Sequence, residues 1–188
     1  RDGHGSITLG SEMAGGIRNL TVKDSLFLHT DRGLRIKTRR GRGKDAVIDQ
    51  ILFENIRMDH VMTPFVISSF YYCDPDGHSP YVAYKEALPV EDMTPDIRTL
   101  CFLKITADNC HVAAAYLYGL PEKKISRVAM EHVRVTYADS AAAGEPAMLD
   151  GIRPVSRMGI FAGNIETLIL EDVVIDGQEG EKIITEHI

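Results

Sequence analysis

The stretch QILFENIRM, residues 50–58, decides the fold because its pattern occurs five times along the chain. In each copy the second and fourth residues are apolar, as Ile51 and Phe53 are here, and the seventh and ninth are mainly apolar. The sixth residue is polar in every copy. The other copies read NLTVKDSLF at 19–27, TLCFLKITA at 99–107, RVAMEHVRV at 127–135 and TLILEDVVI at 167–175.

A slip in the alternation of each copy predicts a corner between two short strands. Residues that are apolar at alternate positions are typical of a strand with one buried face. Here the alternation shifts by one residue between the fourth and seventh positions, which places the polar sixth residue at the corner. The five corner residues are Asp24, Asn55, Lys104, His132 and Asp172.

Corners repeated at uneven separations predict a solenoid whose coils carry loops of different lengths. β-Branched residues and alternation dominate most copies, and no window holds a sustained 3.6-residue period, so the pattern favours a parallel β-helix over a helical solenoid. Another apolar stretch follows each of the first four copies and predicts a further face of the coil, stacked upon itself. These stretches are residues 33–38, 65–67, 113–118 and 158–162.

Two segments exceed what the coil needs, roughly residues 72–96 and 139–157, and we expect them to be surface loops. Both contain Pro, Gly, Ala and charged residues, and loops on one side of a solenoid commonly form the walls of its binding groove. Within the first, DPDGH at 74–78 lacks the ligand spacing of an EF-hand, so it predicts a turn and no metal site.

Length and composition are sufficient for one domain. At 188 residues, 44% of them hydrophobic, we expect a single β-helix domain over residues 1–188. No run of 18 apolar residues is present, so no membrane span is predicted. Cys73, Cys101 and Cys110 match neither a zinc motif nor an obvious disulfide framework, and they do not indicate a compartment. No cofactor or metal ion is expected.

A strip of positive charge stands out from this acidic chain. The segment RGLRIKTRRGRGK, residues 32–44, holds 7 of the 21 basic residues and no acid, whereas the whole chain carries a net charge of −6. A concentrated cationic strip on an acidic body indicates a site for a discrete anion. Nucleic-acid binding is disfavoured, because the acidic body repels phosphate and the strip lacks interleaved aromatic residues.

Within this strip, alternation predicts a strand that presents two cations on one face. Leu34 and Ile36 face one way, while Arg35 and Lys37 face the other, where a guanidinium and an ammonium can share one carboxylate of a ligand. The remainder, residues 39–44, contains two glycines and predicts a flexible, solvated basic loop.

His4 lies between two glycines ahead of the first repeat copy. The glycines leave the backbone free to adopt unusual φ angles and bring the imidazole close to whatever approaches the main chain. One coil later, Arg35 and Lys37 would lie above or below His4 on the same face. An isolated histidine in such a turn is otherwise a solvated or hydrogen-bonded side chain.

Gly3-His4-Gly5, followed 31 residues after the histidine by Arg35-Ile36-Lys37, resembles two signature motifs of glycoside hydrolase family 28, the polygalacturonases and their relatives. The segment between the motifs also resembles bacterial members, and the resemblance covers essentially the whole chain. It implies an all-β fold, a right-handed parallel β-helix of the pectin-lyase-like kind, present here as about five coils without those upstream.

The resemblance also implies roles for particular residues. His4 would lie beside the catalytic centre and support the protonation state or geometry of the reaction. Arg35 and Lys37 would bind the carboxylate of the galacturonate ring next to the scissile bond. Family members place a tyrosine shortly after the next strand, and Tyr71 is the candidate here, with a core or stacking aromatic as the alternative.

The family's acids are absent from this sequence. The resemblance implies inverting hydrolysis by two carboxyl groups about 6.5–9.5 Å apart, one protonating the leaving oxygen and the other activating water. The acids belong to an Asn-Thr-Asp motif and an Asp-Asp motif upstream of Gly-His-Gly, and neither occurs here, nor does Asp2 take the place of either. Asp31 adjoins Arg32, and charge pairing with that arginine is sufficient to explain it.

These observations predict a fragment of a polygalacturonase-type hydrolase that binds pectic polysaccharide or oligogalacturonate and by itself cleaves nothing. Its exposed terminal coils predict end-to-end self-association, and the resemblance implies an extracellular or periplasmic setting. A rhamnogalacturonan or xylogalacturonan hydrolase and a non-catalytic polyuronate-binding β-helix remain alternatives. A pectate lyase ranks lower because it needs a carboxylate-built calcium site, and no acidic cluster lies near Arg35 in sequence.

Overall fold

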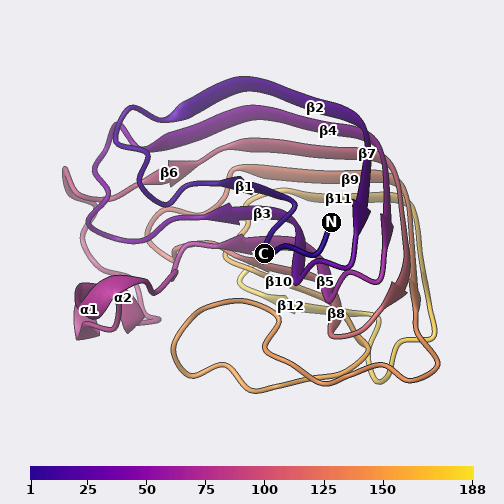
Figure 1. Cartoon of the computed structure of the whole chain (residues 1–188). Helices are drawn as coiled ribbons and strands as arrows, with labels where there is room; N and C mark the ends of the chain where they lie inside the picture. Colours follow the sequence, from indigo (N-terminus) through magenta and orange to yellow (C-terminus); the bar gives the residue numbers. More distant parts are fainter.

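The computed structural model describes residues 1–188, which wind into a right-handed parallel β-helix (Figure 1). Successive strands fall alternately into two parallel sheets, so each turn of the chain adds one strand to each sheet. The long-strand sheet contains, in order, β2 (Ile17–Leu28), β4 (Val47–Asp59), β7 (Thr99–Cys110), β9 (Arg127–Tyr137) and β11 (Leu168–Asp176). The short-strand sheet contains β1 (Ile7–Leu9), β3 (Arg32–Lys37), β5 (Thr63–Ser68), β8 (Ala113–Tyr118), β10 (Met158–Gly163) and β12 (Ile183–Glu186).

The five repeat copies lie one in each strand of the long-strand sheet. Leu20 pairs with Ile51, and Ile51 pairs with Leu100, so equivalent positions of the repeat stack on one another. The apolar stretches between the copies form β3, β5, β8 and β10 and stack in that order. The prediction of a parallel β-helix is confirmed.

The predicted corner is confirmed by the backbone, but it bends one continuous strand of 9–13 residues and does not separate two short strands. A positive φ is uncommon outside glycine and turns the chain sharply, and short polar side chains tolerate it best. Polar side chains at the corner also join one coil to the next: the Asn55 amide donates to Asp24 at 2.6 Å, and Nδ1 of His132 lies 2.8 Å from the carboxylate of Asp172. The five corner residues all have φ between 50° and 54°: Asp24, Asn55, Lys104, His132 and Asp172.

Apolar side chains from both sheets fill the interior. Phe53 and Phe102, on adjacent coils, stack at 5.4 Å, and Phe65 from the short-strand sheet meets Phe102 edge-on at 5.2 Å. Cys110 is also buried here, and all three cysteines are free thiols. No helix of the structure has the length and apolar character needed to cross a membrane.

Both predicted loops depart from the coil. Residues 72–96 contain two single-turn helices, α1 (Asp74–Gly77) and α2 (Pro80–Ala83), and end at β6 (Asp96–Ile97), which pairs with β4 (Figure 1). The segment predicted to be a turn is therefore α1. Residues 139–157 form an excursion whose neck is closed by two hydrogen bonds between Gly144 and Val155.

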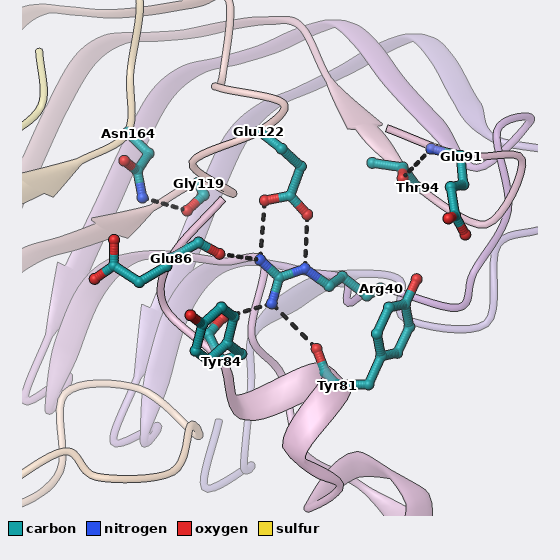
Figure 2. A network of polar contacts seen from close by, with 9 residues as sticks. All are labelled: Arg40, Tyr81, Tyr84, Glu86, Glu91, Thr94, Gly119, Glu122 and Asn164. Atoms are coloured by element: carbon teal, nitrogen blue, oxygen red, sulfur yellow. Dashed lines mark hydrogen bonds and ion pairs between the residues drawn. The ribbon is translucent and has the colours of Figure 1, made fainter. Parts of the chain in front are cut away.

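The prediction of a solvated basic loop at 39–44 is wrong for its first two arginines, which are buried. Nη2 of Arg39 lies 2.7 Å from the carboxylate of Asp76. Arg40 makes a two-point ion pair with Glu122 at 2.6 and 2.9 Å, and both side chains are at most 3% exposed (Figure 2). Acids from distant segments fold over this strip and pair with its charges, which sequence spacing does not reveal.

Candidate functional site

Two of the seven cations in the basic strip bind neither a carboxylate nor a backbone carbonyl within the chain and are therefore free to pair with a ligand. Arg39, Arg40, Arg42 and Lys44 each lie within 4 Å of a carboxylate, at Asp76, Glu122, Glu12 and Asp45 respectively. The guanidinium of Arg32 donates instead to the backbone carbonyls of Asp31 and Glu145. Arg35 and Lys37 make no ion pair.

Strand β3 places both of these cations on the outer face of the short-strand sheet, because Leu34 and Ile36 take the alternate positions in the core. Arg35 is 3% exposed as a residue, and its Nη2 donates to the thioether sulfur of Met148 at 2.8 Å. A thioether is a weak acceptor, so the charge of Arg35 is buried without an anion to balance it.

Tyr71 joins Arg35 and Lys37 to one site. Lys37 Nζ lies 4.2 Å and Arg35 Cζ 5.2 Å from the centroid of the Tyr71 ring, distances at which a cation is attracted to an aromatic face. The backbone N–H of Tyr71 donates to the carbonyl oxygen of Thr38, just after β3. The structure therefore brings together three of the four residues expected from sequence.

The electrostatics of this cluster favour an incoming anion. Burial lowers the pKa of Arg35, and it lowers the pKa of Lys37 with a further contribution from the neighbouring charge of Arg35. The Arg35 shift reflects the cost of taking its charge out of water, and the Lys37 shift reflects that cost together with repulsion from Arg35. A carboxylate placed between the two groups offsets that cost.

His4 is not level with Arg35, although the sequence predicted that it would be. The register of β1 and β3 pairs Thr8, not His4, with Arg35. His4 precedes β1 and stands level with Asp31, whose backbone N–H donates to the carbonyl oxygen of Gly3. The prediction that Arg35 and Lys37 lie above or below His4 on the adjacent coil is therefore wrong in register: the histidine is four residues before Thr8, the partner of Arg35.

Asp31 is the residue that sequence reasoning passed over. Its carboxylate lies 2.7 Å from His4 Nδ1, while Arg32 reaches only its backbone carbonyl. A carboxylate on Nδ1 fixes the tautomer and leaves Nε2 free as an acceptor. The sequence held one signal for this contact: Asp31 follows His4 by 27 residues. Paired residues of β1 and β3 are also 27 residues apart, so this separation places two residues side by side on the first two coils.

Comparison with known proteins identifies the family. A family model described as "Glycosyl hydrolases family 28" matches residues 1–147. The chain belongs to this family. The match includes His4, Arg35, Lys37 and Tyr71.

The relatives within family 28 come from plants and bacteria. A polygalacturonase from Prunus persica is 29% identical over 153 residues, which is 79% of this chain and 36% of that protein. An endo-polygalacturonase from Pectobacterium carotovorum subsp. carotovorum is 31% identical over 134 residues, 71% of this chain and 28% of that protein. An exo-poly-alpha-D-galacturonosidase from Dickeya chrysanthemi is 31% identical over 94 residues, 50% of this chain and 15% of that protein. The chain thus spans about a third or less of the length of these family 28 relatives, and no solved structure matches it.

Proposed function

We propose that this chain provides the substrate-binding part of a family 28 glycoside hydrolase that cleaves α-1,4-galacturonosyl linkages in pectin. The observation that carries the proposal is the pair of cations, Arg35 and Lys37, which have no acid partner and lie against the ring of Tyr71. The names of the relatives, polygalacturonases from plants and bacteria, support the same substrate class.

A galacturonate unit matches the chemistry of these three side chains. Its carboxylate can accept hydrogen bonds from the Arg35 guanidinium and the Lys37 ammonium, and hydrogen bonds to charged groups contribute about 1.5–3 kcal/mol each. The buried ring of Tyr71 lies against both cations and orients them. A neutral sugar would leave both charges unbalanced, so the site discriminates by charge.

The His4–Asp31 pair fits a role beside the reacting bond. With Asp31 on Nδ1, the free Nε2 of His4 can accept a hydrogen bond from a carboxylic acid or a sugar hydroxyl. Inverting hydrolysis needs two carboxyl groups about 6.5–9.5 Å apart. No Asn-Thr-Asp or Asp-Asp motif occurs in residues 1–188, so we propose that cleavage requires acids outside this sequence.

The test joins this chain to an upstream segment that carries both motifs and measures reducing ends released from polygalacturonate. We expect hydrolysis with inversion at the anomeric carbon, observed by NMR, and its loss on Arg35→Ala. The matched control is Arg134→Ala, which removes an exposed arginine on the long-strand sheet. Absence of hydrolysis with an intact fold would contradict the enzyme proposal.

The second candidate is a non-catalytic polyuronate-binding β-helix, favoured by the cations Arg35 and Lys37, which can bind a carboxylate without any hydrolysis. It predicts loss of uronate binding on Arg35→Ala and no cleavage in any longer chain. His4→Ala separates the two functions in the joined chain: the hydrolase loses turnover with little change in uronate affinity, whereas a binding module has no turnover to lose.

A further inference from the structure

The outer face of the short-strand sheet changes character immediately after Arg35. One row of side chains crosses this face at the level of Arg35, and each member pairs with the next in register. Beyond the arginine the row is entirely apolar or aromatic. In order, the row is Thr8, Arg35, Val66, Tyr116, Phe161 and Ile184.

A segment of the loop 139–157 covers the middle of this row. Ala147 and Leu149 are buried, and they pack in one apolar cluster with Val66, Tyr116 and Phe161. We call residues 145–150 the wall segment. Because it occupies the outer surface of β5, β8 and β10, a sugar chain lying along the sheet meets it directly after the coil that holds Arg35.

Polar contacts hold the wall segment to the basic strip at one end and to the loop 72–96 at the other. Arg32 donates to the carbonyl oxygen of Glu145 at 2.6 Å, and Arg35 donates to the sulfur of Met148 at 2.8 Å. At the far end, Nδ1 of His78 lies 2.8 Å from the carboxylate of Asp150. Together with the closed neck of the loop, these contacts describe a fixed barrier.

We propose that the wall segment blocks the outer face of the short-strand sheet beside Arg35, so that the site accepts the terminal uronate of an oligogalacturonate and excludes an internal stretch of the polymer. This inference rests on the proposed function and specifies its substrate: a chain end. Met148 is the residue of the wall segment that contacts Arg35, and a ligand carboxylate replaces its sulfur as the acceptor of the Arg35 hydrogen bond.

The test compares how well two ligands compete for the site when they contain the same amount of uronate but different numbers of chain ends. Trigalacturonate and a long polygalacturonate compete for the unmodified chain against a fluorescent oligogalacturonate, at equal total uronate concentration. A terminal site counts chain ends, so a polymer about 20 times longer than the trimer competes about 20-fold less well. Equal competition at equal uronate concentration overturns the inference.

A variant without the wall provides the second measurement. Replacing residues 145–154 by two glycines joins Gly144 to Val155, whose reciprocal hydrogen bonds already close the neck. The outer row is then open, and the polymer competes as well as the trimer at equal uronate concentration. If the polymer still competes in proportion to its ends in a folded variant, the wall does not cause the restriction.

The same experiment distinguishes failure of this inference from failure of the proposed function. If no uronate ligand binds the unmodified chain, the cation site itself is wrong and the question of ends does not arise. Should the shortened variant not fold, the competition on the unmodified chain decides the inference alone.

Discussion

His4 and Asp31 are 27 residues apart in sequence, yet Nδ1 of the imidazole lies 2.7 Å from the carboxylate, in the turns that lead into the first two strands of the short-strand sheet. Both side chains are more than half exposed, so the contact contributes little to stability. Its consequence is orientation: the carboxylate fixes which nitrogen carries the proton.

Asp31→Ala is therefore expected to change the tautomer of His4 with little effect on the fold. We expect Nδ1 to carry the proton in the native chain, where it faces the Asp31 carboxylate, and Nε2 to carry it largely in the variant, as free imidazole side chains favour. Nitrogen-15 NMR of the imidazole rings measures this, and His4→Gln assigns the signal. The matched control is Asp172→Ala, which removes the carboxylate from Nδ1 of His132. The His4 signal should change in Asp31→Ala and stay the same in Asp172→Ala. An unchanged His4 signal in Asp31→Ala would show that the contact does not exist in solution.

Arg40 and Glu122 are expected to hold the loop that contains α2 onto the coil. All five N–H donors of Arg40 are used, two on Glu122 and three on the carbonyl oxygens of Tyr81, Tyr84 and Glu86 (Figure 2). Breaking a buried pair leaves one charge uncompensated, so Glu122→Gln is expected to destabilise the chain by about 3–5 kcal/mol. Urea unfolding measures the loss, and hydrogen exchange should rise in residues 81–86.

The control for this pair is Arg134→Ala, because Arg134 and Asp176 form an exposed ion pair at 3.3 Å. An exposed pair contributes about 0–1 kcal/mol. Equal effects of Glu122→Gln and Arg134→Ala would mean that burial of the Arg40–Glu122 pair has no energetic consequence.

Lys85 gives the chain a stability that depends on pH. Its ammonium lies 3.8 Å from the centroid of the Phe70 ring and has no hydrogen-bond partner. Burial lowers the pKa of Lys85 from 10.5 to about 8, Asp150 opposes this shift and Arg40 adds to it. Below about pH 8 the lysine is charged in both states, and the folded chain carries the cost of desolvation. Between about pH 8 and 10.5 the folded chain releases a proton that the unfolded chain retains, so stability rises through this window.

Lys85→Met removes this cost. The variant is expected to be more stable than the native chain at pH 7 by about 1 kcal/mol, a figure that allows for the solvent still reaching the side chain. Its advantage should shrink towards pH 10.5. Lys44→Met, at an exposed lysine, serves as the control in urea unfolding. A native chain that matches Lys85→Met at every pH would contradict the assignment of a desolvated ammonium.

The sequence determined the coil because the repeat is a local pattern. Asn55 and its equivalents mark the slip in alternation, and a positive φ follows from that slip without knowledge of any distant contact. Arg35 and Lys37 were predictable for the same reason, since alternation along one strand fixes their common face.

Other features depended on contacts that local patterns do not encode. Arg40 meets Glu122 across 82 residues, so its burial could not be anticipated from spacing. Asp31 meets His4 only through the register of two coils. The wall segment packs by apolar side chains from an irregular loop, whose path no periodicity describes.

The most direct measurement of the central claim is calorimetric titration of trigalacturonate into the native chain and Arg35→Ala, with the fully methyl-esterified trimer as the matched ligand. Esterification removes the charge but keeps the sugar. The account predicts binding of the acid form that weakens about tenfold or more on Arg35→Ala and on esterification. It also predicts weaker binding at high salt and no change on Arg134→Ala. Equal affinity for the acid and the ester, or an Arg35→Ala variant that binds as tightly as the native chain, would contradict the account.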